Sequence, residues 1–160
     1  MFKHRVFEEL LEAMASDAMS PGSGAAAASA LALGVACLRK AVAVSIKHDP
    51  DNVELEEAAA RLCGLSERAF AAADADVIGF PRLASDQRSK EERAQSADDL
   101  AALGERVSEL CAQLVSEAGM IEAHIRPAMA NDLLAARHLG EAAAAIAKAN
   151  GAENATKAAK

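Results

Sequence analysis

The chain has 160 residues, of which 52% are hydrophobic but only 2% aromatic, and its formal net charge is −7. That length suits one domain with one core. The negative charge and the lack of Trp and Tyr argue against a nucleic acid or an anionic membrane as partner. Alanine, the best helix former, supplies much of the apolar content, and runs of β-branched and aromatic residues typical of strands are absent from the sequence. We therefore predict an all-α fold, a single-domain bundle of about five to six helices spanning residues 1–160.

The amino-terminal segment and the cysteines indicate the compartment. Met1–Arg5 carries charges and is not followed by the apolar core of a signal peptide, which predicts a cytoplasmic protein. Cys37, Cys63 and Cys111 are widely spaced in apolar surroundings, a pattern typical of buried, reduced thiols. The four histidines share no ligand spacing, so we expect no metal site.

The first two predicted helices differ in how apolar they are. The first covers Lys3–Ala15 and is amphipathic. The second covers Ala25–Lys47 and is apolar all round through Leu38, as expected of a helix at the centre of a bundle. Its uninterrupted apolar run of about 14 residues is too short to span a bilayer, so we predict a buried helix. The apolar face of the first helix consists of Val6, Phe7, Leu10, Leu11 and Met14.

Two capping signals mark the third and fourth helices. Asp51 with Glu54 has capping-box spacing and predicts the start of a third helix that Pro81 ends. Ser89 with Glu92 is a second capping box and predicts the start of the fourth. The expected core stripe of the third helix is Leu55, Ala59, Leu62, Ala69, Phe70, Ala73 and Val77. That of the fourth, with the three-four alternation of a bundle seam, is Leu100, Leu103, Val107, Leu110, Leu114 and Ala118.

A short fifth helix is predicted over Met120–Ile125 and a last one over Asn131–Lys148, with a frayed tail from Ala155 to Lys160.

A core built on alanine buries little area per residue. We therefore expect a homodimer, with the apolar seam from Leu100 to Leu114 as a surface that needs covering.

The segment Pro21-Gly22-Ser23-Gly24 lies directly before the second helix. Glycines at that place let backbone N–H groups converge on a ligand, and the helix dipole favours negative charge there. A tight turn between two packed helices explains the same residues, and spacing alone favours the turn. The pattern is neither a P-loop nor a nucleophile elbow.

Polar residues near helix ends form a second group of candidates. Asp74 and Asp76 approach the end of the third helix, where the dipole disfavours a carboxylate unless it is exposed or functional. Asp132 follows Asn131 at the start of the last helix, where an N-terminal cap is the plain interpretation. Two asparagines one turn apart, compatible with a C-cap and a loop residue, are Asn150 and Asn154.

Taken in chain order, these segments resemble the cyclodeaminase/cyclohydrolase family, which includes the folate-handling helical domain of formiminotransferase-cyclodeaminase. The family's glycine loop P-G-G-G-S-A-A-A is similar to residues 21–28, and its A-L-G is similar to residues 32–34. Its D-x-D-x-x-A-F segment resembles residues 74–80, its N-P-n-a-x-S-D-L segment residues 126–133, and its N-x-x-x-N the pair Asn150 and Asn154. The resemblance covers Leu10 to Asn154.

The resemblance implies a mostly helical homodimer that binds folate in a cleft near the subunit interface. It implies either cyclodeamination of 5-formiminotetrahydrofolate or hydrolysis of 5,10-methenyltetrahydrofolate, with a tetrahydrofolate derivative as substrate and no metal or redox cofactor. Carboxylates in a water-poor cleft suit the proton transfers of both reactions. Asp76 and Asp132 would act as acid–base or pterin-contacting groups. The other implied substrate-binding residues are Pro21, Gly22, Ser23, Gly24, Asp74, Asn131, Asn150 and Asn154.

Two alternatives remain open at this point. Ser23, Ala25 and Arg126 stand where the family pattern has glycine, serine and asparagine, so the chain is also compatible with a catalytically degenerate relative that binds a small molecule or a partner. A helical interaction protein is the third possibility. Binding of tetrahydrofolate separates the first two from the third, and turnover separates the first from the second.

Overall fold

The computed structural model describes residues 7–158, and the predictions for Met1–Val6, for the side chain of Phe7 and for the last two residues lie outside its described part. All of its regular elements are helices, which confirms the predicted all-α fold. The five α-helices are α1 (Phe7–Ala15), α2 (Ser23–Ile46), α3 (Val53–Leu83), α4 (Lys90–Met120) and α5 (Ala130–Ala158). Two short 3-10 turns, Glu122–His124 and Pro127–Met129, replace the predicted fifth helix.

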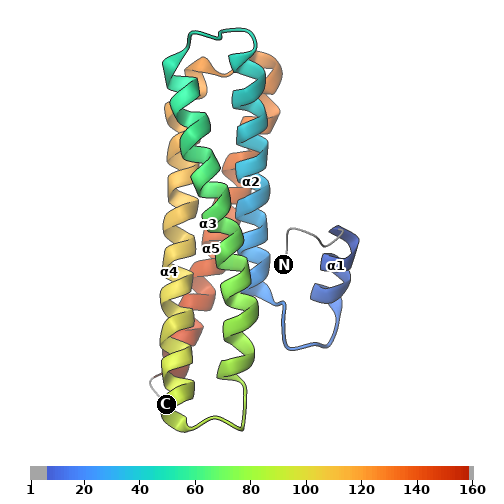
Figure 1. Cartoon of the computed structure of the whole chain (residues 1–160), viewed down its shortest axis with the longest axis vertical. Coiled ribbons are helices and arrows are strands. Elements are labelled where there is room, and N and C mark those ends of the chain that lie inside the picture. The colour runs from blue at the N-terminus through green and yellow to red at the C-terminus, as the bar shows by residue number, and fades with distance from the viewer. Residues whose placement is uncertain (1–6, 159–160) are drawn as a thin grey trace.

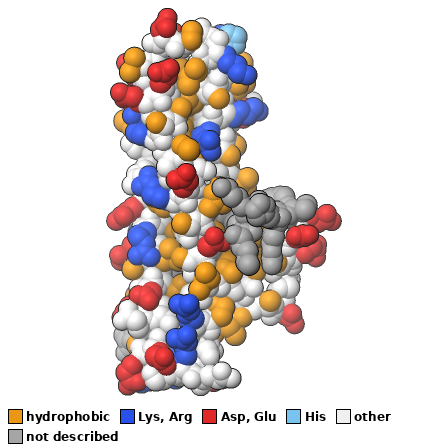
Figure 2. All heavy atoms as spheres, in the orientation of Figure 1, with side chains coloured by type: hydrophobic (Ala, Val, Ile, Leu, Met, Phe, Trp, Pro, Cys, Tyr) orange, Lys and Arg blue, Asp and Glu red, His pale blue; other side chains and the backbone are white. Residues whose placement is uncertain are grey.

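Helices α2 to α5 form an antiparallel four-helix bundle in which each helix packs beside the next and α5 returns to α2 (Figure 1). Helix α1 stands away from the bundle on the side of α2 (Figure 1). Charged side chains of both signs and apolar side chains alternate over the face shown in Figure 2. The bundle gives long parallel seams, which is how a chain poor in large side chains gains contact area.

Helix α2 supplies much of the core, as predicted. It is long and apolar enough to cross a membrane by length and composition, the one such helix among residues 7–158. The core helix of a water-soluble bundle passes the same test, and α2 packs against α3, α4 and α5. The apolar stretch of α2 is therefore longer than the uninterrupted run of about 14 residues counted in the sequence. Its buried residues are Ala25, Ala27, Ala28, Leu31, Gly34, Val35, Leu38, Ala41, Val42 and Ser45.

The capping predictions were right for α4 and wrong in detail for α3. Ser89 and Glu92 form the predicted capping box. At the start of α3, however, the cap is Asn52, whose side chain accepts a hydrogen bond from the amide of Leu55. Asn and Asp cap equally well, and the local turn rather than the sequence decides which of two adjacent candidates does so.

The predicted seam of α4 is buried, but it is buried inside the bundle, so it offers no surface to a second copy. Two burial predictions were wrong. Phe70, predicted in the core stripe of α3, is 40% exposed. Of the cysteines, all predicted to be buried, Cys63 is exposed and Cys37 is half-buried. Helix α5 also continues through the predicted frayed tail to Ala158. Asn150 and Asn154 are consequently interior residues of α5 and not a C-cap and a loop residue.

Candidate active site at the start of helix α2

Pro81 fixes the glycine loop against α3. It lies inside α3, although the sequence predicted that it would end the helix. A proline has no N–H to donate to the carbonyl four residues earlier, here that of Val77. The Ser20 hydroxyl instead donates to this carbonyl oxygen over 3.3 Å. The proline thus frees an acceptor, and the segment preceding α2 binds to it.

The start of α2 leaves its backbone amides available. Gly22 is the N-cap, has an extended backbone (φ −124°, ψ −153°) and offers no side chain to cap the helix. The Ser23 hydroxyl turns away and donates to the Oδ1 of Asn150 on α5, over 3.0 Å. The first amides of an α-helix have no partner within the helix, so they can donate to an acceptor placed before α2.

Asp76 of α3 is placed against these amides. Its carboxylate lies so close to Gly24 that a Cβ at this position would collide with it. Burial raises the pKa of Asp76 above its ordinary value, and a hydrogen bond from the backbone amide of Ala25 partly offsets that rise. The close approach explains why glycine stands at this point of α2: any larger side chain would push the carboxylate away.

A pocket of about 180 Å³ joins most of the predicted site residues. The glycine loop and the two asparagines line it together, although they are far apart in the sequence. Asn154 is only 8% exposed, and it lines this pocket. A side-chain amide in a pocket wall has both a donor and an acceptor that can hydrogen-bond a ligand. The predicted residues in the lining are Gly22, Ser23, Gly24, Asp76, Asn150 and Asn154.

Three charged or aromatic lining residues were not predicted: Phe80, Glu153 and Lys157. Phe80 lies one turn after Asp76 on the same face of α3, so helical spacing would have found it. Lys157 follows Asn154 and Asn150 at helical spacing on α5, but the predicted end of the helix at Lys148 hid this relation. Lys157 forms an ion pair with Glu153 over 2.7 Å, and its ammonium group lies 5.6 Å from the centre of the Phe80 ring.

The remaining predicted site residues lie elsewhere in the chain. Asp132 is in the first turn of α5, inside the helix and not at its cap, and its carboxylate pairs with Lys40 over 3.4 Å. It precedes Asn150 by 18 residues, so it lies about 27 Å along α5 from the pocket. Asp132 and Asp76 therefore do not share a cleft within one chain. The exposed Asn131 is near Asp132, while the half-buried Asp74 and Pro21 do not line the pocket.

The pocket offers one carboxyl group with a raised pKa, the amides at the start of α2 and two asparagine side chains. This set can bind a polar, planar heterocycle by hydrogen bonds and exchange a proton with it. Among residues 7–158, no group of three or more His, Cys, Asp or Glu side chains is placed to hold a metal ion.

Comparisons with known proteins bear on the family and the fold of the chain. A family model for formiminotransferase-cyclodeaminase matches residues 6–159. The crystal structure of a formiminotetrahydrofolate cyclodeaminase from Thermotoga maritima superposes with a TM-score of 0.91 at 19% sequence identity, over 98% of this chain and 81% of that chain. A search of curated protein sequences finds no significant match. At that identity the superposition shows a shared fold, while the family match spans nearly the whole chain. The chain therefore belongs to the formiminotransferase-cyclodeaminase family.

Proposed function

We propose that this chain is an enzyme of one-carbon folate metabolism that forms or hydrolyses 5,10-methenyltetrahydrofolate, as a cyclodeaminase or a cyclohydrolase. The observation that carries the proposal is the half-buried Asp76 carboxyl, held at the amino end of α2 in a pocket that Asn154 also lines. A pterin is planar and has hydrogen-bond donors and acceptors along its edge, which match amides and a carboxyl group. Membership of the family supports this substrate class.

Asp76 supplies the proton transfer in either reaction. In cyclodeamination, N10 of 5-formiminotetrahydrofolate attacks the formimino carbon, the C–N bond to ammonia breaks, and a carboxylic acid protonates the leaving nitrogen. In cyclohydrolysis, water adds to the methenyl carbon and a carboxylate takes up its proton; the bond from this carbon to N5 then breaks, the proton passes to N5, and the formyl group stays on N10. A raised pKa keeps a larger share of the group protonated near neutral pH, which suits the acid role better than an ordinary aspartate does. Neither reaction needs a metal or redox cofactor.

The proposed enzyme is a homodimer in which Asp132 reaches the site of the other subunit. The outer face of α2 carries a three-four stripe, Ala26, Ser29, Leu33, Ala36 and Lys40, opposite its buried face. Leu33, near the middle of this stripe, is 46% exposed.

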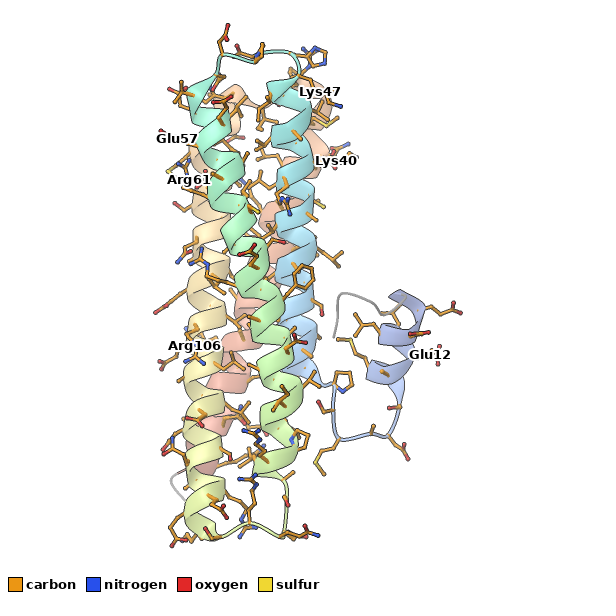
Figure 3. All side chains as sticks on the ribbon, in the orientation of Figure 1. Glu12, Lys40, Lys47, Glu57, Arg61 and Arg106 are labelled. Atoms are coloured by element: carbon orange, nitrogen blue, oxygen red, sulfur yellow. The ribbon has the colours of Figure 1, made fainter. Side chains whose placement is uncertain are left out.

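A two-fold axis near Leu33 would pair two α2 helices in opposite directions. Gly24 and Lys40 lie at similar distances from that axis, roughly 12 Å each. The pairing would therefore bring Lys40, and with it Asp132, to the partner's glycine loop (Lys40 is labelled in Figure 3).

The direct test is titration of the purified protein with 5,10-methenyltetrahydrofolate, following its absorbance for binding and for loss, and a parallel assay of ammonia release from 5-formiminotetrahydrofolate. Turnover of either compound above the spontaneous rate is expected. Saturable binding of tetrahydrofolates without turnover would replace the enzyme by the degenerate relative. Absence of binding to any tetrahydrofolate would leave a helical interaction protein.

A further inference from the structure

A small recess adjoins the pocket at the start of α2 and extends from the Asp76 carboxyl into the core of the bundle. It has a volume of about 20 Å³ and shares Gly24, Asp76 and Asn150 with the pocket. Asp76 and Asn150 carry the only polar side chains among the described residues that line it. The rest of its lining is buried and consists of Ala27, Ala72, Leu100, Leu103, Gly104, Val107 and Ala147.

The size of the recess restricts what it can hold. A cavity of roughly 10–15 Å³ is the minimum for one water molecule, which also needs at least two polar partners. Typical small-molecule sites have roughly 300–1,000 Å³, so no ring of a folate fits into a space of about 20 Å³. The recess therefore suits a molecule with a single non-hydrogen atom.

The two polar side chains offer complementary hydrogen-bonding groups. The Oδ1 of Asn150 accepts a hydrogen bond from the Ser23 hydroxyl over 3.0 Å, so the NH2 half of this amide provides its donors. The Asp76 carboxyl accepts from the amide of Ala25 and has further lone pairs. Water both donates and accepts, so it can bridge Asn150 and Asp76. Ammonia has a similar size and the same two capacities.

Each reaction proposed above uses one molecule of this kind. In cyclohydrolysis, a water oxygen bonds to the methenyl carbon and one water proton passes to Asp76. In cyclodeamination, the bond between the formimino carbon and the leaving nitrogen breaks, and Asp76 supplies the proton with which ammonia departs. Resting on the proposed function, we infer that the recess binds this small reactant, the attacking water or the departing ammonia, while the folate occupies the outer pocket.

The test fills the recess from its apolar wall. Val107→Ile adds one methylene group on α4, at a residue that lines the recess but not the outer pocket. Turnover should fall at least about tenfold, because the small reactant is displaced or misplaced, while the dissociation constant of 5,10-methenyltetrahydrofolate changes less than about twofold. The matched control is Val35→Ile, since Val35 is fully buried on α2 and does not line the recess. It should retain turnover.

A second pair of variants adds a single oxygen atom instead, in case Val107→Ile does not fold. Ala72→Ser places a hydroxyl at the recess, and Ala69→Ser places one at a buried residue of α3 outside it. Ala72→Ser should lower turnover and Ala69→Ser should not. Equal losses in a variant and its control, or a parallel loss of folate affinity, would overturn the inference.

A high-resolution crystal structure of the protein without folate gives a readout that does not depend on the proposed function. One ordered water is expected within about 3.2 Å of both the Asp76 carboxyl and the Asn150 amide, and it should be absent from Val107→Ile. A wild-type recess without this water, or a Val107→Ile variant that lacks the water but keeps full turnover, would overturn the inference alone. If wild type holds the water but neither binds nor converts any tetrahydrofolate, the proposed function fails and the reactant role of the recess fails with it.

Discussion

At the scale of single residues, the site depends on one carboxyl group in two opposing environments. Burial disfavours the charged form of Asp76, whereas the amide of Ala25 at the start of α2 favours it. Burial is the larger influence, so the pKa is raised. A carboxyl group whose charge is unfavourable in the resting protein is a good proton donor, and it also makes the folded state less stable at neutral pH.

Replacing Asp76 with Asn is expected to separate the role of its carboxyl group in proton transfer from its cost to the stability of the fold. Turnover should fall at least about a hundredfold, because the amide cannot exchange a proton, while its oxygen still accepts the hydrogen bond from Ala25. Because the pKa of Asp76 is higher in the folded state, the wild-type free energy of unfolding falls as pH rises from the ordinary value of about 3.9 through the raised value.

The variant lacks this contribution. Its stability relative to wild type should therefore be lowest in acid and increase towards neutral pH, as measured by urea unfolding at several pH values. A variant that loses stability relative to wild type as pH rises would show that the carboxylate is stabilised in the fold and is not held at a cost.

Gly24 tests whether the placement of Asp76 matters for function. Gly24→Ala puts a methyl group where the carboxylate lies, so Asp76 must move away from the Ala25 amide. We expect turnover to fall about a hundredfold, the effect of misplacing a reacting group by roughly 1 Å. Gly64→Ala is the matched control, because a Cβ on Gly64 meets no atom within 4 Å. It should be neutral or up to about 1 kcal/mol more stable. Equal activity of the two variants would argue against the assignment of Asp76.

At the scale of helices, periodicity predicted the elements well and their ends poorly. The alternation from Leu100 to Ala118 located α4 because its buried stripe is local in the sequence. Pro81 was misjudged because its missing hydrogen bond is replaced by Ser20, a residue that a local pattern cannot connect with α3. The extension of α5 to Ala158 depends on packing against α4, where Gly104 and Gly151 let the two backbones approach. Tertiary packing therefore decides the helix ends that local signals leave open.

This close approach predicts the cost of a methyl group at Gly104. A Cβ there would lie 2.8 Å from the carbonyl oxygen of Ala147 and 2.9 Å from the Cα of Gly151, and backbone atoms cannot turn aside as a side chain can. Gly104→Ala should therefore destabilise the protein by about 1–3 kcal/mol despite its better helix propensity. Gly119→Ala, with open space at the Cβ, should not. Thermal unfolding of both variants by circular dichroism measures the difference, and equal melting temperatures would show that α4 and α5 are not held this closely.

At the scale of the whole molecule, the sequence singled out residues that share a pocket, but it did not give their arrangement in space. The glycine loop, Asp76 and both asparagines meet in one pocket, because α2, α3 and α5 bring their ends to the same part of the bundle. Asp132 does not lie in this pocket. A sequence motif gives the order of residues along one chain, but it does not show which subunit supplies each of them to a site. Asp76 lies beside Gly24 at the start of α2, whereas Asp132 pairs with Lys40 near the other end of α2, and an antiparallel pairing of two α2 helices would bring these two ends together.

Mixing two inactive variants tests this pairing. Asp76→Asn and Asp132→Asn should each lose most turnover, because every site in either homodimer lacks one carboxylate. After unfolding together and refolding at equal amounts, half of the dimers are mixed, and each mixed dimer has one site with both carboxylates, so about a quarter of wild-type activity should return.

Two different affinity tags, purified in sequence, isolate the mixed dimers and show that they have formed. Recovery of activity in that fraction can arise only if a site takes Asp76 from one chain and Asp132 from the other, because no single chain holds both. If the purified mixed dimers stay inactive, or if Asp132→Asn alone keeps full activity, Asp132 serves only its ion pair with Lys40 at the far end of the bundle.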